Sequence, residues 1–383
     1  MMTRSGDRLG VFLAAAVLLP SLFTGCRESV GEIRIGVIAM IEGVNAKDGL
    51  AMVHAAELAA KQANAQGGIP AGGGRVRVVL LVEKDPNNPE GALEAARKLI
   101  AKDKVAALIG PQFSGTAIPV ARLAENSRIV MIAPSSTNPE TTAGKDYVFR
   151  IPFLDTIQGT VLARFARENL RAQRAAVLYD AAADYNRTLA EEFRRAFESG
   201  GGKVAAFEAY TTDRNADFSM QLRRISRAEP DVLFLPNYAA DVRPQAVQAR
   251  QLGVSAALLG GDAWESSFDA LDAFDGSYYS TLWHPSLDTG PSRVFMTAYR
   301  NEYGGDPPPM AAVTYEAFSI LLRAVEAAGS TDPTAVQRAL HGLRGYEGVT
   351  GSIEYATGGD PRKSVLIVKI EGHGEKVHAV VAP

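Results

Sequence analysis

Short apolar runs alternate with amphipathic helical patterns along this sequence, and that alternation limits the fold more than any other feature. Each apolar run has the length of one buried strand, and a helix-length stretch separates it from the next. Strands that alternate with helices form parallel sheets with helices on both faces. We therefore predict an α/β protein built from doubly wound parallel sheets.

A short extended segment that ends in proline, residues 147–152, interrupts the alternation, which then starts again. The second round is about as long as the first, and helical patterns after residue 285 suggest that the chain returns to the first lobe. A chain of 383 residues is also too long for one ordinary core. We predict two lobes joined by a hinge, with a cleft that closes on a ligand: an N-terminal lobe of residues 32–149 plus 285–352, and a C-terminal lobe of residues 150–284 plus 353–383.

The N-terminus has the features of a secretory signal. Residues 1–25 combine two arginines with an apolar stretch that is too short to span a bilayer, and Cys26, the single cysteine, follows directly. Thr24-Gly25-Cys26 resembles a bacterial lipobox, although Phe23 departs from its usual pattern. We expect a lipoprotein signal peptide, lipidation at Cys26, a tether over residues 26–31, and a periplasmic or cell-surface location through this anchor alone. The alternative is that the cysteine follows the signal by chance.

Composition and motifs argue against several classes of function. Hydrophobic residues make up 46% and charged residues 22%, with a formal net charge of -3, which is typical of a soluble globular protein without a nucleic-acid partner. Ser114 lacks the first glycine of a Gly-x-Ser-x-Gly elbow and has no histidine placed to activate it. We predict no enzyme activity, no cofactor and no metal site; the histidines lack metal-ligand spacing, namely His54, His284, His341, His373 and His378.

Hydroxyl residues follow two neighbouring predicted strands. Ser135, Ser136 and Thr137 come after the strand at 129–133, and Ser114 follows the strand at 105–109 and a turn. Ligands of open α/β sheets bind at such carboxyl ends of strands, and helix N-termini favour anions, so we expect a ligand with a carboxylate. We expect Ser114 to be the N-cap of a helix that runs to about residue 126. The alternative is that these hydroxyls only cap helices and turns.

A set of motifs in a fixed order resembles the type I periplasmic solute-binding proteins of the branched-chain amino acid class, which serve ABC transporters. The resemblance covers about residues 32–380. It rests on these segments: Ile35-Gly36-Val37, residues 65–69 (Ala-Gln-Gly-Gly-Ile), residues 105–110 followed by Ser114, residues 132–139, Tyr147-Val148-Phe149-Arg150, Asp184-Tyr185, Gly260-Gly261-Asp262 and residues 351–355.

The resemblance implies a role for several residues of the cleft. Ser114 and Thr137 match the residues that hold the ligand's α-carboxylate, and Ser135 sits where a backbone carbonyl accepts from the ammonium. Asp262 matches an acid that pairs with the ammonium from the opposite lobe, while Tyr185 and Tyr238 match tyrosines that pack against the ligand. The alternative is that Asp262 is a turn residue and that the two tyrosines are ordinary surface aromatics.

The sequence departs from this class in the wall that surrounds the ligand's side chain. Asp48 and Gln112 stand where leucine-type binders place an aromatic and an apolar residue, and Phe113 lies beside them. Burying polar groups without partners is costly, so a branched-chain ligand would leave Asp48 and Gln112 poorly satisfied. We expect a polar, cationic or amide-bearing amino acid-like solute, while Trp264 leaves an aromatic ligand open.

Two functions of different kinds follow. The first is a monomeric extracytoplasmic receptor that captures an amino acid or amino acid-like solute between its lobes and presents it to the permease of an ABC transporter. The second is a regulatory lipoprotein of the same fold that binds no ligand, for example an activator of cell-wall synthases. The second predicts a cleft that is blocked or lacks the groups for a carboxylate and an ammonium.

Overall fold

The computed structural model describes residues 1–2, 31–211, 216–264, 271–355, 358–372 and 374–382. Residues 3–25 of the predicted signal peptide, the predicted lipidation residue Cys26, most of the tether and His373 lie outside these residues. Within them, no helix is long and apolar enough to cross a membrane.

The first sheet has six strands in the order β2-β3-β1-β4-β5-β6. All neighbouring pairs are parallel except β2 with β3, so this lobe has the expected parallel sheet with one antiparallel edge. Strand β1 lies in the middle, and its residues from Ile33 to Ala39 are buried except Arg34. The strands are β1 (Gly31–Ala39), β2 (Ile69–Ala71), β3 (Gly74–Lys84), β4 (Ala107–Ile109), β5 (Val130–Ala133) and β6 (Val148–Arg150).

Helices from two distant parts of the chain cover the first sheet. The early ones follow its strands, and the late ones return after the second lobe; α10 packs along α1 and against β2, β4 and β5. The burial of Phe318, Leu321 and Val325 on α10 shows why this late helix belongs to the first lobe. The elements are α1 (Ala46–Ala65), α2 (Pro89–Arg97) with a π-helical turn (Lys98–Lys102), α3 (Ser114–Ser127), α9 (Gly290–Tyr303), α10 (Pro309–Ala328), α11 (Pro333–His341) and the hairpin β12 (Tyr346–Gly348) with β13 (Gly351–Ile353).

The second sheet has seven strands in the order β15-β14-β11-β10-β9-β7-β8. The strands from β7 to β11 are parallel to their neighbours, whereas β14 and β15 add an antiparallel edge. The strands are β7 (Arg174–Asp180), β8 (Lys203–Tyr210), β9 (Val232–Leu235), β10 (Ala257–Gly260), β11 (Tyr278–Thr281), β14 (Val365–Glu371) and β15 (Gly374–Val381). The helices of this lobe are α4 (Asp155–Glu168), α5 (Asp184–Ser199), α6 (Ser219–Arg227), α7 (Ala239–Gln251) and α8 (Leu271–Phe274).

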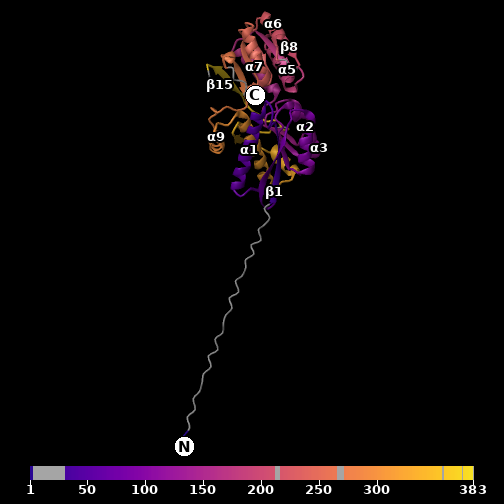
Figure 1. Cartoon of the computed structure of the whole chain (residues 1–383), viewed down its shortest axis with the longest axis vertical. Helices are drawn as coiled ribbons and strands as arrows, with labels where there is room; N and C mark the ends of the chain where they lie inside the picture. The colour runs from indigo at the N-terminus through magenta and orange to yellow at the C-terminus, as the bar shows by residue number, and fades with distance from the viewer. Residues whose placement is uncertain (3–30, 212–215, 265–270, 356–357, 373, 383) are drawn as a thin grey trace.

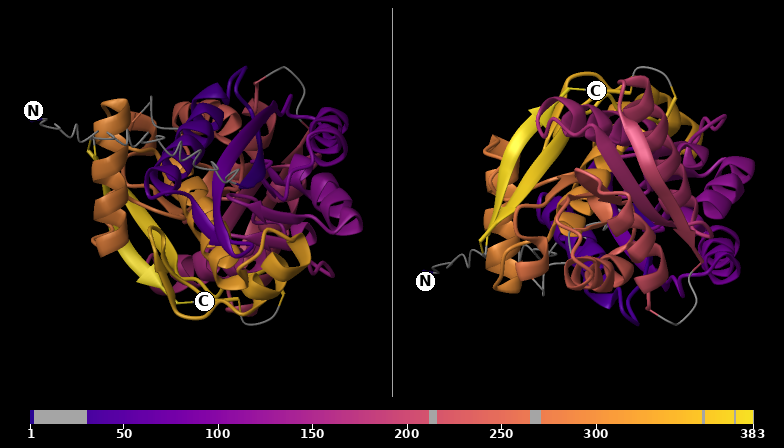
Figure 2. Two further views of the ribbon diagram at one scale, coloured as in Figure 1. Left: turned by 90° about the horizontal axis from the view of Figure 1, so that it is seen from below. Right: turned by 90° about the horizontal axis from the view of Figure 1, so that it is seen from above.

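The chain crosses between the two sheets three times: after β6, after β11 and before β14. Figure 1 shows the result as two stacked lobes, with α1, α2 and α3 in one and α5, α6 and α7 in the other. Seen along the long axis, α9 and the last strands run along the same side of the molecule (Figure 2). The prediction of a two-lobed, doubly wound α/β fold is therefore confirmed.

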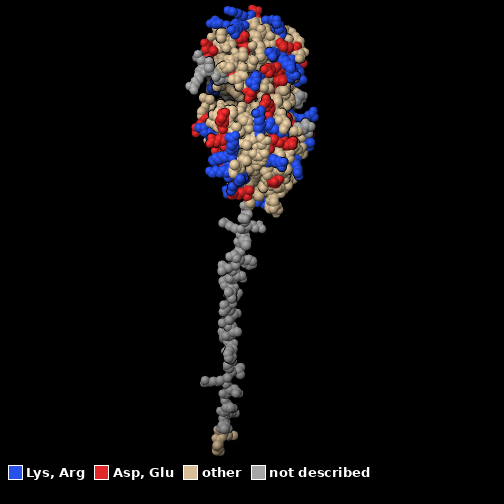
Figure 3. Space-filling model, turned by 90° about the vertical axis from the view of Figure 1, so that its right-hand side faces the viewer, with Lys and Arg blue, Asp and Glu red and all other residues tan. Residues whose placement is uncertain are grey.

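Acidic and basic side chains are interspersed over the face shown in Figure 3. This distribution matches the small net charge of -3. A mixed surface of this kind does not concentrate the positive potential that draws nucleic acids.

Candidate ligand-binding site

The loops that follow β4 and β5 bring the predicted hydroxyl residues together. The turn after β4 begins at Gly110, which has a φ of +94°, and a Cβ there would lie 2.4 Å from the Ile38 carbonyl oxygen. Only glycine meets both demands at low cost. Behind this turn, Ser114 Oγ lies 3.0 Å from Ser136 Oγ, and Ser136 Oγ lies 2.8 Å from Thr141 Oγ1.

The prediction that Ser114 caps the helix is wrong. Phe113 occupies the N-cap position with extended backbone angles and no side-chain cap, and Ser114 is the first helical residue of α3. The hydroxyl of Ser114 is directed at Ser136 and away from the backbone of its own helix. Thr116 and Ala117 donate their N–H groups to the Phe113 carbonyl oxygen, so Ser114 and Gly115 are the positions of α3 whose N–H groups an anion can reach.

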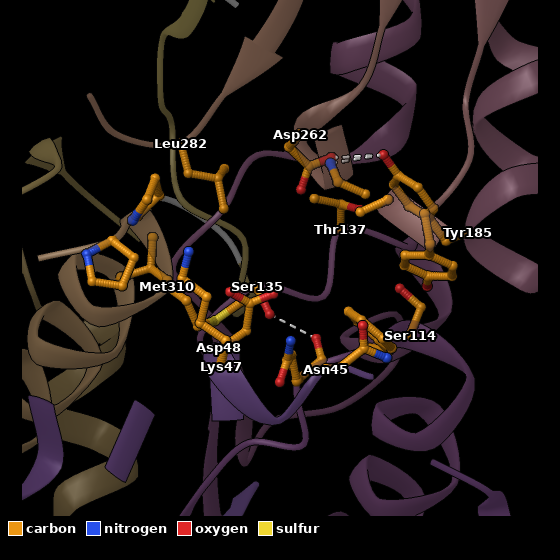
Figure 4. A pocket seen from close by; sticks show the side chains of 18 residues that line it. Asn45, Lys47, Asp48, Ser114, Ser135, Thr137, Tyr185, Asp262, Leu282 and Met310 are labelled. Carbon is orange, nitrogen blue, oxygen red and sulfur yellow. Dashed lines mark hydrogen bonds between the residues drawn. The ribbon is translucent and has the colours of Figure 1, made fainter. Parts of the chain in front are cut away.

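A cavity of about 100 Å³ lies between the lobes. Its wall includes nearly all the residues that the sequence indicated: Asp48, Gln112, Phe113, Ser114, Ser135, Thr137, Tyr185, Tyr238 and Asp262. Figure 4 shows Asp262, Tyr185 and Thr137 on one side of the cavity and Asn45, Lys47 and Asp48 on another. Ser136 does not line the cavity, because its hydroxyl is buried behind Ser114.

Trp264 does not line the cavity either, so its expected place in the wall is wrong. Its side chain is fully buried, its Nε1 donates to the Leu235 carbonyl oxygen at 2.9 Å, and its ring meets Phe274 edge-on. The indole packs into the core of the second lobe because Gly260 leaves room for it: a Cβ there would lie 2.1 Å from the ring. Trp264 therefore gives no reason to expect an aromatic ligand.

Sequence reasoning missed the part of the wall that comes from distant segments. Asn45 and Lys47 lie at the start of α1, Leu282 follows β11, and Met310 and Val313 belong to the first turns of α10. No motif marks these positions, and Met310 and Val313 reach the cleft only because α10 returns to the first lobe. The remaining wall residues are Ala239, Ala263, Pro308 and Pro309.

Asp262 is held at the cavity by neutral hydrogen-bond donors. Its Oδ1 accepts from Gln158 Nε2 and from the Tyr185 hydroxyl, each at 2.9 Å. Gln158, which the sequence did not indicate, also accepts from the Asp262 backbone N–H and from Ser280. Burial raises the pKa of Asp262 to about 6, because these hydrogen bonds only partly offset the loss of water.

A second buried acid, Asp155, lies beneath this site at the start of α4. Burial and the nearby charge of Asp262 raise the pKa of Asp155 well above its usual value. Among the described residues, the Asp155 carboxyl oxygens and the Thr137 hydroxyl make no hydrogen bond of good geometry. The Thr137 hydroxyl nevertheless lies close enough to Asp155 to lower its pKa, which partly opposes the effect of burial. The Asp155 backbone N–H donates to the Thr137 carbonyl oxygen at 2.9 Å, which fixes that residue.

The two lobes touch around the cavity. The rings of Phe113 and Tyr238 lie 4.3 Å apart across the cleft, and Tyr238 packs against Tyr185 at 5.2 Å. Asn138 Nδ2 donates to the Asp184 carbonyl oxygen and to Thr188 Oγ1 of the second lobe. These contacts place the rings of Phe113, Tyr185 and Tyr238 between Asp262 and the loops after β4 and β5.

Gln112 is the unusual member of the wall. It is 1% exposed, yet neither its Oε1 nor its Nε2 has a hydrogen-bond partner within the described part of the chain. Its backbone carbonyl oxygen is used, since it accepts from Ser135 Oγ at 2.7 Å. A buried amide without partners costs stability unless another molecule supplies them.

The described residues contain no cluster of histidine, cysteine and acidic side chains that could hold a metal ion. His284 bonds to Ser286, and His341 to the Asp146 carbonyl oxygen. His54 stacks on Tyr303, while the His378 ring contacts Phe165 and Tyr278.

A hinged pair of α/β lobes with an acid and a hydroxyl loop facing one cavity defines a solute-binding protein of the type I periplasmic fold. The chain belongs to the periplasmic binding protein family, whose model matches residues 32–375. Leu/Ile/Val-binding protein homolog 3 of Brucella melitensis biotype 1 is 28% identical over 334 residues, which cover 86% of this chain and 88% of the relative.

Solved structures agree with this assignment. The leucine-binding protein LivK of Thermotoga maritima is 30% identical with a TM-score of 0.85, covering 92% of this chain and 99% of its own. LivJ of Streptococcus pneumoniae, a branched-chain amino acid transporter substrate-binding protein in complex with isoleucine, is 25% identical with a TM-score of 0.83, covering 92% and 100%. The resemblance to the branched-chain amino acid class is confirmed, and the chain is a non-enzymatic solute-binding protein.

The raised pKa of Asp262 predicts a pH-dependent gain of stability in Asp262→Asn. The folded protein binds more protons than the unfolded chain between about pH 4 and pH 6, so charging Asp262 costs folding free energy as the pH rises. Asn keeps the acceptor for Gln158 and Tyr185 without the charge. We expect Asp262→Asn to unfold like the parent at about pH 4 and to be more stable by about 1–3 kcal/mol at about pH 8.

Urea unfolding across this pH range checks the prediction. The exposed Asp288, which pairs with Arg293 on the surface, supplies the control variant Asp288→Asn. A stability difference for Asp262→Asn that does not change with pH would contradict the buried, ionisable role of this carboxyl.

Proposed function

We propose that this protein is an extracytoplasmic receptor that captures an amino acid or amino acid-like solute when its lobes close, and that it delivers this solute to the permease of an ABC transporter. The observation that carries the proposal is a buried acid of one lobe, Asp262, and the N-terminus of α3 in the other lobe, both at one cavity. An α-amino acid carries the two complementary charges on neighbouring carbon atoms.

The carboxylate of such a ligand would lie at the start of α3. The Tyr238 hydroxyl lies at the backbone N–H of Ser114 and can rotate to donate to a carboxylate. Ser135 and Thr137 add hydroxyl and backbone groups from the loop after β5. A helix N-terminus stabilises an anion by its dipole and its unpaired donors together.

The ammonium would lie between Asp262, the Thr137 hydroxyl and the tyrosine rings. Thr137 Oγ1 is buried beside Asp155 and makes no hydrogen bond of good geometry among the described residues, so a cationic donor would satisfy its acceptor lone pairs. The ring faces of Tyr185 and Tyr238 favour a cation in the same place. Because Asp262 and the two tyrosines belong to the second lobe, these contacts form together with the Ser114 contacts only when the lobes meet, and this difference drives closure.

The relatives support an amino acid without fixing which one. LivK of Thermotoga maritima is named as a leucine-binding protein, and LivJ of Streptococcus pneumoniae was solved with isoleucine. At 25–30% identity the wall around the ligand's side chain is free to differ. The regulatory lipoprotein without ligand predicts a blocked cleft, whereas both charged ends of a zwitterion find partners in this cavity.

Thermal unfolding of residues 27–383 with each common amino acid in turn tests the proposal. A ligand at about one hundred times its dissociation constant adds roughly 2.7 kcal/mol of stability, which raises the melting temperature clearly. We expect a shift with one chemical class of amino acid and none of comparable size in Asp262→Asn. If no zwitterion shifts the parent protein, the amino acid proposal fails, and the regulatory lipoprotein gains support.

Gln112 predicts a preference within that panel. An amide presents one donor and one acceptor, and a side-chain carboxamide on the ligand matches both. We expect L-glutamine or L-asparagine to bind more tightly than L-leucine in the parent protein. Because leaving a buried amide unpaired costs roughly 1–3 kcal/mol, the unbranched apolar variant Gln112→Met should reverse this order by about tenfold or more. Calorimetric titration measures it; an unchanged order in Gln112→Met would refute the role of Gln112 in specificity.

A further inference from the structure

We propose that Asp360, which does not line the cavity, is a positioning residue for ligand capture: through Arg150 and Thr142 it fixes the binding loop. The binding loop is residues 134–142, which carry Ser135, Ser136 and Thr137. The inference rests on the proposed function, since it concerns the same site. It assigns a role in binding to the third crossing between the lobes, which is the chain between β13 and β14. None of the described residues of this crossing lines the cavity.

Arg150 holds the binding loop from behind. It ends β6, its side chain is fully buried, and its Nη1 donates to the Ser136 carbonyl oxygen at 2.8 Å. Its Nη2 donates to the Asn138 carbonyl oxygen at 2.8 Å and to Thr142 Oγ1 at 2.5 Å. The two carbonyls flank Thr137, so one rigid guanidinium fixes the backbone on both sides of a cavity residue.

Asp360 supplies the charge that this guanidinium needs. Its Oδ1 lies 2.7 Å from Arg150 Nε and accepts a hydrogen bond from Thr142 Oγ1 at 2.6 Å. A buried guanidinium without a counter-ion is costly, and its hydrogen bonds to neutral carbonyls do not cancel its charge. Arg150, Thr142 and Asp360 thus form one closed network, the latch, in which each member contacts the other two.

The latch belongs to the third crossing between the lobes. The Gly359 carbonyl oxygen accepts from the Arg150 backbone N–H at 3.0 Å, and a Cβ on Gly359 would lie 1.9 Å from the Val148 carbonyl oxygen. The Tyr355 hydroxyl donates to the Arg150 carbonyl oxygen at 2.8 Å. Tyr355 and Gly359, which precede Asp360 in the chain, are therefore held against the edge strand β6.

The third crossing also contacts the first crossing, which is the chain that follows β6. Lys363, which is 5% exposed, directs its Nζ at the Ile151 carbonyl oxygen, at 3.5 Å, and bonds to Thr350. Glu316 of α10 accepts from the Thr350 backbone N–H at 2.7 Å. The third crossing is thus attached to the first lobe from residue 359 to residue 363, immediately before β14 enters the second sheet. A change in the path of this crossing is transmitted to the binding loop through the latch.

The test uses Asp360→Asn, which keeps the size of the side chain and an acceptor oxygen but removes the charge. In the parent protein and the variant, hydrogen exchange of the backbone amides is measured without any added amino acid. We expect the non-proline amides of residues 134–142 to exchange at least about tenfold faster in Asp360→Asn, because the fully buried guanidinium of Arg150 loses the charge of its counter-ion. Amides of β9 and β10, in the second lobe, should keep their rates.

Affinity supplies the second measurement. L-Leucine and L-glutamine are titrated into both proteins, and we expect the tighter of the two to bind about tenfold or more weakly to Asp360→Asn. Thr142→Ser keeps the hydroxyl that joins Arg150 to Asp360 and should behave like the parent, whereas Thr142→Val should behave like Asp360→Asn. Asp288→Asn, which removes a charge from an exposed ion pair, is the matched control.

The outcomes separate this proposal from the proposed function. If no amino acid of the thermal-unfolding panel binds to the parent, the assignment of the ligand fails, while loop-specific exchange in Asp360→Asn still supports the latch. Parental exchange rates in residues 134–142 would overturn the latch. Faster exchange spread evenly over both lobes would overturn it as well, because a purely structural ion pair lowers the stability of the whole chain without singling out the binding loop.

Discussion

The site depends on a carboxylate that the fold keeps away from water. Asp262 is buried against Gln158 and Tyr185, and its raised pKa records the cost of holding a charge there. The neutral donors Gln158 and Tyr185 stabilise the charge of Asp262 by hydrogen bonds but do not neutralise it. A cationic group that enters the cavity relieves this cost, so the energy that Asp262 loses on burial becomes available for binding. A salt bridge formed within the protein at this position would have removed that advantage.

The sequence predicted the fold and part of the cavity wall, because both depend on local patterns. Alternating strands and helices define a parallel sheet, and hydroxyls directly after two neighbouring strands must meet at one edge. Ser114, Ser135 and Thr137 therefore reached the cavity as expected. The errors concern orientation: Ser114 stands one place inside the helix, and Trp264 points into the core. A position in the chain does not show which way its side chain turns.

Sequence reasoning missed other residues of the site for a different reason. Gln158 and Asp155 are placed by contacts that no spacing reveals, since their partners lie in other segments of the chain. Met310 and Val313 reach the cavity only because α10 returns to the first sheet. Long-range packing produces such contacts, and a single sequence carries no separate signal for them.

The return of the chain also affects how the protein can be made. The first sheet is covered by α10, which comes late in the chain. The antiparallel edge of the second sheet is formed by β14 and β15, which follow α10. Neither lobe is therefore an autonomous folding unit that could be finished as it leaves the ribosome. Each lobe therefore has its full set of strands and helices only when the last third of the chain is present.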